Sequence, residues 1–311
     1  MILTVTLNVA IDKAYRVDEL KPGEVMRVRE CTYTAGGKGL NVTKAAKIAG
    51  ADVLATGFIG GHAGAFVREQ LDDKGIANDF VAVNGETRSC INIIDSKTGV
   101  QTELLEPGFT VTDEDVAALM QKFDTLLERA DIVTFSGSAP AGCSDTIYTD
   151  LIERVKAAGK KAILDSSGTL LVNGIQARPI LIKPNRDELS ALAGLPAGND
   201  SQIADYAGRL HHDGMIDYVV VSLGTDGALL ACADGVFRGT APVIAAVNTV
   251  GCGDAMVAAL AVGFERGYGA VEMLRFALAV ATANALTLET GWYRPEDLPG
   301  ILDQCKVSEI N

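Results

Sequence analysis

The strongest constraint on the fold is a repeated alternation of short apolar runs with helical patterns. The runs are rich in β-branched residues and apolar at most positions, which suits parallel strands buried on both faces of a sheet. They are the segments 2–9, 51–60, 131–138, 161–168, 180–185 and 218–224. Helical patterns occupy the segments 39–49, 62–74, 113–129, 144–158 and 201–212. The alternation predicts an α/β fold, a doubly wound and mostly parallel sheet with helices on both faces.

Two segments, 13–34 and 87–106, break this alternation. Each carries strand patterns around a turn signal, Pro22-Gly23 in the first and Thr98-Gly99 in the second. Neither fits a crossover helix, so we expect both in a small second sheet, here called the lid, over the carboxyl edge of the main sheet. Two long apolar helices are expected near the end, one beginning near Gly253 and one over 270–288. Without a repeat or linker, residues 1–311 are expected to form a single unit.

The composition limits the class of function. A net charge of −13 does not attract nucleic acid or an anionic membrane, so an anionic ligand needs a local basic pocket. The six cysteines form no C-x-x-C pair and the three histidines are scattered, so we expect reduced thiols in a cytoplasmic protein and no structural zinc. The amino terminus lacks a basic region and the chain lacks a long apolar stretch, so neither a signal peptide nor a transmembrane helix is expected.

Familiar nucleotide-binding loops are missing. The segment AGGKGLN (35–41) has Gly39 after the lysine and therefore fails as a phosphate-binding P-loop. The segment GCGDAM has Met256 where a dinucleotide fingerprint requires its third glycine, and it comes late in the chain. A dehydrogenase is therefore disfavoured.

The segment NTVGCGDAMVAAL (248–260) combines a glycine-rich turn with a carboxylate at the start of an apolar helix. The backbone N–H groups of Gly251, Cys252 and Gly253 would converge with the positive end of the helix dipole and form an anion hole. Asp254 has two interpretations. It caps the helix, which the segment alone favours, or it removes a proton from a nucleophile that attacks the bound anion.

Two further segments supply groups for an anionic ligand. Gly36 and Gly37 allow a ligand to approach the backbone, and Lys38 and Asn41 add a charge and an amide, although a loop with a solvated lysine has the same pattern. Arg88 on the lid is suited to binding phosphate through two parallel hydrogen bonds, or is an exposed arginine. Arg27, on the other lid segment, is a weaker candidate of the same kind.

Two segments in the second half have a local and a functional interpretation. Asn185 and Glu188 stand three residues apart at a helix start, where they form a capping box or let the carboxylate hold a hydrated Mg²⁺. The segment SLGTDGALL (222–230) is either a simple β-hairpin or a loop over the phosphates of a nucleotide.

In chain order, six segments resemble the ribokinase-like (PfkB) carbohydrate kinases over almost the whole chain: TLNVAID, AGGKGLN, TRSC, KPNRDE, SLGTDGA and NTVGCGDAMVA. TLNVAID and Arg88 look like the branch that acts on phosphorylated ketohexoses, which includes 1-phosphofructokinase and tagatose-6-phosphate kinase. Residues 87–108 look more like the tagatose-6-phosphate kinases. Cys252 stands where the family commonly has alanine or serine.

The resemblance implies a role for each candidate residue. Asp254 would be the base that deprotonates the attacking sugar hydroxyl, and the amides of residues 251–253 would stabilise the transferring phosphoryl group. The sugar hydroxyls would be held by Asp12, Gly36, Gly37 and Asn41, and the phosphate of the acceptor by Lys38, Arg88 and Arg27. Lys183 and Asn185 would serve the ATP phosphates and Glu188 the Mg²⁺ ion. The nucleotide site would be lined by Ser222, Gly224, Thr225, Gly227 and Asn284.

The resemblance therefore implies an ATP- and Mg²⁺-dependent kinase, with D-tagatose 6-phosphate as the first acceptor and fructose 1-phosphate as the alternative. Two other functions are a sugar-phosphate sensor without catalysis and a kinase for nucleosides or unphosphorylated sugars. The intact Asp254 disfavours the sensor, and Arg88 disfavours an acceptor without phosphate. Exposed edges of the lid favour pairing, so a homodimer through the lid is expected.

Overall fold

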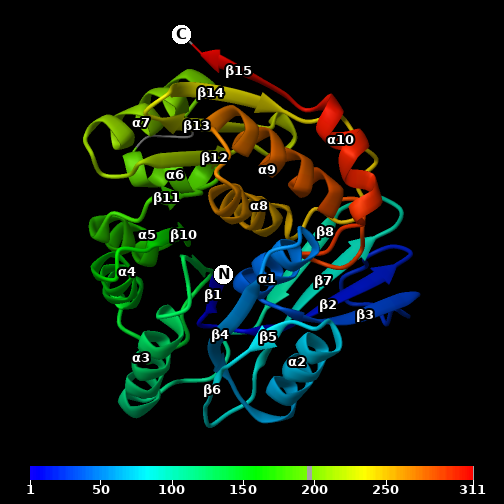
Figure 1. The fold of residues 1–311 in the computed structure, drawn as a ribbon. Helices are drawn as coiled ribbons and strands as arrows, with labels where there is room; N and C mark the ends of the chain where they lie inside the picture. The colour runs from blue at the N-terminus through cyan, green and yellow to red at the C-terminus, as the bar shows by residue number, and fades with distance from the viewer. Residues whose placement is uncertain (195–197, 311) are drawn as a thin grey trace.

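The computed structural model describes residues 1–194 and 198–310 and gathers the apolar runs into one large sheet (Figure 1). All pairs from β5 to β12 are parallel, whereas β12, β13, β14 and β15 are joined by antiparallel pairs. In sheet order the strands are β15 (Lys306–Ile310), β14 (Gly235–Thr240), β13 (Ala228–Cys232), β12 (Tyr218–Ser222), β11 (Leu181–Ile182), β10 (Lys161–Asp165), β9 (Ile132–Ser136), β1 (Ile2–Thr6), β4 (Val53–Ile59) and β5 (Ala77–Asn78), and β6 (Val81–Ala82) also pairs with β4.

Helices cover both faces of this sheet, as predicted. One face carries α1 (Lys38–Ile48), α2 (Gly61–Asp73), α8 (Cys252–Arg266), α9 (Ala270–Asn284) and α10 (Leu298–Gln304). The other carries α3 (Asp113–Leu127), α4 (Ile147–Ala157), α5 (Gly168–Gly174), α6 (Arg186–Ala193) and α7 (Asp200–His212). Three short 3₁₀ turns, η1 (Ile175–Ala177), η2 (Gly224–Asp226) and η3 (Pro295–Asp297), join these elements in the described residues.

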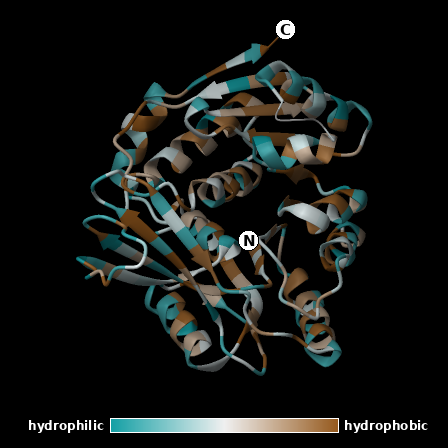
Figure 2. Ribbon diagram, turned by 180° about the vertical axis from the view of Figure 1, so that it is seen from behind, coloured by the Kyte–Doolittle hydropathy of each residue, from teal (hydrophilic) through white to brown (hydrophobic). Residues whose placement is uncertain are grey.

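The strands are apolar on both faces because they separate two cores. Ile2 and Ile163 belong to the core under α8 and α9, whereas their neighbours Leu3 and Leu164 belong to the core under α3 and α4. Successive side chains of a strand point to opposite faces, so a buried parallel strand needs apolar residues at consecutive positions. The hydrophobic strands lie between helices in Figure 2.

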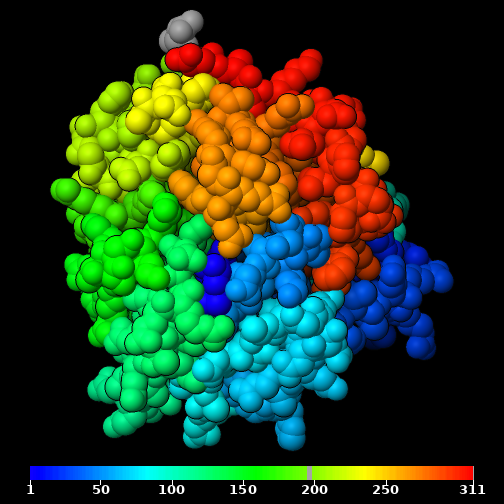
Figure 3. All heavy atoms as spheres, in the orientation of Figure 1, coloured from blue at the N-terminus to red at the C-terminus, as the bar shows by residue number. Residues whose placement is uncertain are grey.

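The lid is a separate sheet with the order β3-β2-β7-β8. It consists of β2 (Ala10–Val17), β3 (Glu30–Gly36), β7 (Arg88–Asp95) and β8 (Gln101–Leu105), and it projects from the side of the molecule (Figures 1 and 3). The predicted small sheet is confirmed, with different bounds. β2 begins at Ala10 and so includes Asp12, and residues 18–29 are not a strand but a connection that contains the Pro22-Gly23 turn.

Several predicted bounds were wrong for local reasons. β11 has two residues instead of the six of 180–185, since Pro184 has no N–H for a strand ladder. The last long helix ends at Asn284 and not at residue 288. There the Thr287 hydroxyl lies 3.1, 3.1 and 2.9 Å from the carbonyl oxygens of Asn284, Glu289 and Trp292, to any one of which it can donate, where the chain turns back. The antiparallel strands β14 and β15 were not predicted.

Two findings concern the whole described chain. Among residues 1–194 and 198–310, no helix combines the length and the apolar character that crossing a membrane requires. In the same residues, all six cysteines are free thiols.

Candidate active site

Asp12, predicted to bind the sugar, and Asp254, predicted to be the base, are connected by the side chain of Asn41 in the first turns of α1. Its Nδ2 donates to Asp254 Oδ2 at 2.9 Å and lies 3.4 Å from Asp12 Oδ2. Asp12 comes from the lid strand β2, Asn41 from α1 and Asp254 from α8, and α1 packs against α8. Three segments that are far apart in the sequence therefore place two carboxylates on either side of one amide.

Asp254 is not a helix cap. Helix α8 begins at Cys252, its N-cap is Gly251, and the hydrogen bond that Asp254 receives in the described residues comes from Asn41. Gly251 has a φ of 86°, and a Cβ added there would lie 2.9 Å from the backbone nitrogen of Gly291. Only glycine fits this turn, because a side chain would be strained and would collide with the opposite loop.

The environment of Asp254 suits a general base. Only 6% of the residue is exposed, and this burial raises the pKa of its carboxyl to about 6. The cations of Lys38 and Lys183 and the amide of Asn41 act in the opposite direction, while the carboxylate of Asp165 adds to the rise. A carboxyl with this pKa is ionised at neutral pH and still accepts a proton readily.

The glycine turn before α1 is shaped around Asp12. Gly37 is the N-cap of α1 with a φ of 90°, and its N–H lies 3.3 Å from Asp12 Oδ1. A Cβ added to Gly36 would overlap the carboxylate of Asp12. Both glycines therefore let the backbone approach the lid carboxylate closely.

Asp165 is a candidate that the sequence analysis missed. It stands at the carboxyl end of β10, is 1% exposed, and neither of its carboxylate oxygens has a hydrogen-bond partner in the described residues. Lys183 Nζ lies 3.3 Å from Oδ1 and Lys38 Nζ lies 3.9 Å from the same atom. Buried carboxylate oxygens without hydrogen bonds fit a site for a hydrated cation beside these lysines.

The two lysines have different environments. Lys183 is buried, and its Nζ would lie 3.4 Å from a Cβ added to Gly253. Its charge is therefore next to the turn of residues 251–253, the predicted anion hole, which is called the anion-hole turn below. Lys38 is half-exposed, and the carboxylate of Asp165 is the main reason why its pKa is raised. Both positions suit cations that neutralise phosphate oxygens.

The capping box at α6 is present. Asn185 Oδ1 accepts the N–H of Glu188 at 2.8 Å, and Glu188 Oε2 accepts the N–H of Asn185 at 2.8 Å. The other carboxylate oxygen of Glu188 is not used by the box, and the negative charge of Glu188 contributes to the raised pKa of Lys38. The local interpretation is confirmed, and a role for Glu188 at Mg²⁺ stays a prediction.

The segment 222–230 is a hairpin with a glycine turn. Ser222 ends β12, η2 holds Gly224 and Thr225, and Gly227 has a φ of 92° with no room for a Cβ against the carbonyl of Gly239. A bridge between Ser222 and Asn185 places this turn beside the start of α6. The role of the turn at a nucleotide stays a prediction.

Asn284 contacts the anion-hole turn through Val250 and Cys252. The buried Asn284 Nδ2 donates to the carbonyl of Val250 at 3.3 Å and lies 3.6 Å from Cys252 Sγ. Burial raises the pKa of the Cys252 thiol to about 11, so the thiol stays protonated at neutral pH. Contact of Asn284 with a nucleotide stays a prediction.

The two arginines differ. Arg88 is held by backbone: its Nε and Nη2 donate to the carbonyl of Asn8 at 3.3 and 3.2 Å, and its Nη1 donates to Glu106 at 3.0 Å. Two of the five guanidinium N–H groups are left for a ligand. Arg27 is exposed between β2 and β3, and within residues 1–194 and 198–310 no hydrogen bond or ion pair joins it to the cluster.

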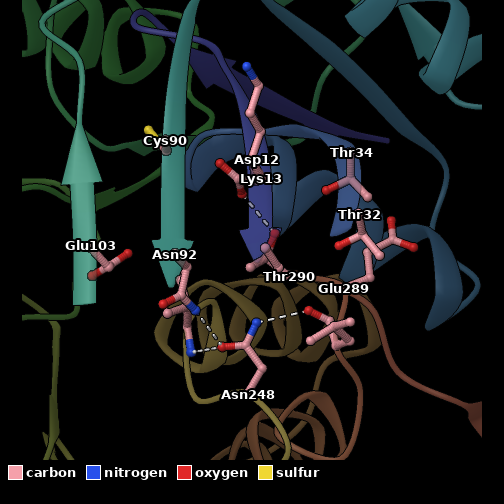
Figure 4. A pocket seen from close by; sticks show the side chains of 13 residues that line it. Asp12, Lys13, Thr32, Thr34, Cys90, Asn92, Glu103, Asn248, Glu289 and Thr290 are labelled. Carbon is pink, nitrogen blue, oxygen red and sulfur yellow. Dashed lines mark hydrogen bonds between the residues drawn. The ribbon is translucent and has the colours of Figure 1, made fainter. Parts of the chain in front are cut away.

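A small cavity lies on the inner side of the lid next to Asp12 (Figure 4). Its volume is about 30 Å³, which is enough for water but not for a hexose. Glu103 and Asn92 line it from the lid and Thr290 from the loop after α9. A sugar that reaches Asp12 from this side would contact these lid and loop side chains.

The comparisons with known proteins agree with this geometry. The model of the pfkB family carbohydrate kinases matches residues 5–293. A protein from Staphylococcus aureus assigned to the phosphofructokinases is 30% identical, with 100% of this chain and 99% of that chain covered and a TM-score of 0.83. A protein from Thermotoga maritima assigned as a 1-phosphofructokinase is 28% identical, with both chains covered fully and a TM-score of 0.89. The tetrameric inhibited form of phosphofructokinase-2 from Escherichia coli is 28% identical over 97% of this chain and 98% of that chain, with a TM-score of 0.89.

The chain belongs to the pfkB family of carbohydrate kinases. It is an ATP-dependent sugar-phosphate kinase with the ribokinase-like fold, as the sequence analysis predicted.

Proposed function

We propose that residues 1–311 act as one kinase unit that phosphorylates a ketohexose phosphate, with D-tagatose 6-phosphate as the first acceptor and D-tagatose 1,6-bisphosphate as the product. The observation that supports this most directly is the Asn41 bridge. It holds the buried Asp254, with a pKa of about 6, beside Asp12 at the end of the lid. A base next to a sugar-binding carboxylate is what phosphoryl transfer to a hydroxyl needs.

In this proposal Asp254 accepts the proton of the attacking hydroxyl. Asp12, Gly36, Gly37 and Asn41 orient the sugar, so that the hydroxyl reaches the γ-phosphoryl group in line. The N–H groups of Gly251, Cys252 and Gly253 stabilise the charge on the transferring group. The N–H of Cys252 would then exchange its long hydrogen bond, 3.4 Å to the carbonyl oxygen of Thr249, for one to the anion. Positioning and charge stabilisation supply most of the rate enhancement in this kind of reaction.

The cations and the nucleotide side complete the site. Lys183 and Lys38 neutralise phosphate oxygens, and Asn185, Ser222, Gly224, Thr225, Gly227 and Asn284 form the nucleotide edge. Asp165 and Glu188 fit a hydrated Mg²⁺, which would neutralise charge on the ATP phosphates. Because the buried Asp165 already faces two lysines, the chain itself balances much of the charge there.

The acceptor is proposed to carry its own phosphate at Arg88. Backbone carbonyls fix the guanidinium and leave two N–H groups free, which suits a phosphate bound through two hydrogen bonds. Lys38 and Arg27 would add positive charge. The resemblance of residues 87–108 favours tagatose 6-phosphate, while the similarity to a protein assigned as a 1-phosphofructokinase keeps fructose 1-phosphate as the alternative.

A homodimer through the lid is part of the proposal. The face of the lid opposite the cavity carries Tyr15, Tyr33, Ile91, Ile93 and Leu104, since these residues alternate with the ones that line the cavity. Leu104 is 53% exposed. An apolar sheet face of this kind is suited to a second copy of the same face. A cytoplasmic location stays a prediction from the sequence.

The test of the acceptor is a panel assay. Purified protein with ATP and Mg²⁺ is given tagatose 6-phosphate, fructose 1-phosphate, fructose 6-phosphate, an unphosphorylated ketohexose and a nucleoside, and ADP release is measured. The highest kcat/KM is expected with tagatose 6-phosphate. A higher kcat/KM with fructose 1-phosphate would make that sugar phosphate the acceptor in place of tagatose 6-phosphate. Negligible turnover with every ketohexose phosphate would refute the proposed function.

The test of the base is Asp254→Asn. Because asparagine cannot accept the hydroxyl proton, kcat is expected to fall by roughly 10²–10⁴-fold, the range of general-base contributions. The control is Asp303→Asn, the same change at an exposed position of α10 without an ion pair in the described residues. Turnover of Asp254→Asn near that of the control would show that Asp254 is not the base.

A further inference from the structure

We infer that Thr290 is a positioning residue that orients the carboxylate of Asp12 for the acceptor sugar, an inference that rests on the proposed function. The Thr290 hydroxyl donates to Asp12 Oδ2 at 2.7 Å, although the two residues are 278 positions apart in the chain. The contact is drawn in Figure 4. Thr290 lies in the loop between α9 and η3, which carries none of the motifs in the sequence.

Thr290 makes the shortest of the three hydrogen bonds to Asp12. Gly37 N lies 3.3 Å from Oδ1 and Asn41 Nδ2 lies 3.4 Å from Oδ2, and Asn41 also donates to Asp254 at 2.9 Å. Asp12 stands on a lid strand, so its position relative to α1 and α8 depends on contacts that reach across from the main body. Hydrogen bonds to a carboxylate are stronger than those between neutral groups, so a hydroxyl at 2.7 Å fixes the group well.

The loop that carries Thr290 is itself anchored. Glu289 Oε1 lies 3.0 Å from Lys74 Nζ and 3.7 Å from Lys44 Nζ, and Lys74 Nζ stands 4.1 Å from the centre of the Trp292 ring. Lys44 is fully buried and donates to the carbonyl of Ala35 at the end of β3. The loop is therefore fixed to α1, α2 and the lid strand that leads into the glycine turn.

The backbone of the loop also fits tightly. Gly291 has a φ of 65°, and a Cβ added there would overlap the backbone of Asn41. Gly251 faces the same glycine from the anion-hole turn. One loop thus contacts the sugar-binding turn, the catalytic turn and the lid carboxylate, and Thr290 is its hydroxyl donor to Asp12.

The hydrogen bond determines which oxygen of Asp12 receives the sugar. Oδ2 is engaged by Thr290 and Asn41, whereas among residues 1–194 and 198–310 Oδ1 has only the long contact from Gly37. Oδ1 is therefore the acceptor for a sugar hydroxyl. If Thr290 loses its hydroxyl, the carboxylate rotates, so the sugar binds less well while the base and the nucleotide side are unchanged.

The test compares Thr290→Val, which keeps the shape and removes the hydroxyl, with Thr290→Ser, which keeps the hydroxyl. Steady-state kinetics vary the ketohexose phosphate and ATP separately. Thr290→Val is expected to raise KM for the sugar phosphate about tenfold, a change of about 1.4 kcal/mol, with kcat and KM for ATP within about twofold of the unchanged protein. Thr290→Ser is expected to restore the sugar KM.

The control is Thr287→Val, the same change in the same loop, where the lost hydroxyl bonds only to backbone carbonyls. A similar rise of the sugar KM in both valine variants, or equal rises for sugar and ATP, would show a general loosening of the loop and overturn the inference. An unchanged sugar KM in Thr290→Val would do the same.

Crystal structures of the unchanged protein and of Thr290→Val provide a readout without turnover. The carboxylate of Asp12 is expected to rotate in the variant, and an unmoved carboxylate would overturn the inference. If the unchanged protein turned over no ketohexose phosphate, the proposed function would fail, while these structures would still decide whether Thr290 orients Asp12.

Discussion

Asp254 combines two opposing requirements at a single residue. The proposed role as a base needs an ionised carboxylate in a site without water, and burial is the largest cause that raises the pKa of Asp254 to about 6. Lys38, Lys183 and Asn41 offset part of this effect. The residue is therefore expected to lower the stability of the fold at the pH where the enzyme works.

This conflict predicts a pH-dependent gain of stability in Asp254→Asn. The folded pKa of about 6 lies above the ordinary carboxyl value of 3.8, so the folded state binds the proton more strongly and loses stability as the pH rises from about 4 to 6. Above pH 6 the variant should be more stable by up to about 3 kcal/mol, from roughly 1.4 kcal/mol per pKa unit. Well below the ordinary carboxyl pKa of 3.8 the difference should vanish.

Chemical denaturation at pH 4.5 and pH 8 checks this prediction, with Asp303→Asn as the control for the loss of one charge. A gain at pH 8 that shrinks strongly at pH 4.5 is the expected result. The same difference at both pH values would mean that the ionised carboxylate does not destabilise the fold.

At the scale of the elements, the proposed mechanism places its chemistry at the amino ends of α1, α6 and α8. Of these three helices, α6 follows a parallel strand of the main sheet, β11, at the sheet edge where α/β proteins bind ligands. Helix α1 instead follows the lid strand β3, and α8 follows β14, which pairs antiparallel with its neighbours. The amino end of α6 shows how one side chain serves two purposes. One oxygen of Glu188 completes the capping box with Asn185, and the other oxygen is free of it.

Glu188→Gln separates these purposes. Glutamine retains the capping box, so the free energy of unfolding should change by less than about 0.5 kcal/mol. The lost charge should raise the Mg²⁺ concentration for half-maximal activity severalfold, because a neutral amide holds a hydrated cation less well. Glu188→Ala, the comparison variant, should in addition lose about 1 kcal/mol of stability. An unchanged Mg²⁺ requirement in Glu188→Gln would remove Glu188 from the cation site.

At the scale of the whole molecule, the lid has two unlike faces. Its inner face carries polar groups around the cavity, including Asp12, Asn92 and Glu103, whereas its outer face carries tyrosine, isoleucine and leucine. The rings of Tyr15 and Tyr33 meet edge to face with centroids 6.3 Å apart and form part of that outer surface.

Leu104→Asp tests whether a second copy covers the outer face. A charge within an apolar interface opposes association, so the dissociation constant of the dimer should rise by at least about tenfold in sedimentation velocity. Val271→Asp is the control, since Val271 has a similar exposure of 46% on α9, away from the lid. A monomeric unchanged protein, or equal weakening by both variants, would contradict dimerisation through the lid.

The fold was predictable wherever the signal was local. Strands with apolar residues on both faces and amphipathic helices leave periodic patterns, so the doubly wound sheet and the lid were found. The antiparallel strands β14 and β15 were missed because β15 is mostly exposed at the edge of the sheet and its pattern is polar. Bounds were wrong where a single side chain ends an element, as Thr287 does after α9.

The candidate site was likewise predictable only where its residues stand in short motifs of the sequence. Asp254 and the glycine turns stand in short motifs, and their conformations follow from backbone geometry. Asp165 was missed, although an acid at the carboxyl end of a buried strand is a usable signal. Thr290 had no signal at all, because its role follows only from a contact across 278 residues.

That long separation also has a consequence for protein synthesis. Asp12 leaves the ribosome early, but Asp254 and the loop that holds Thr290 follow only after most of the chain has been made. At roughly 5–20 residues per second, the interval is on the order of 10–60 s. The lid strands β2, β3, β7 and β8 can pair with one another during that time. If Asp12 and Asp254 act as proposed, an incomplete nascent chain cannot assemble the site and consumes no ATP until translation is almost finished.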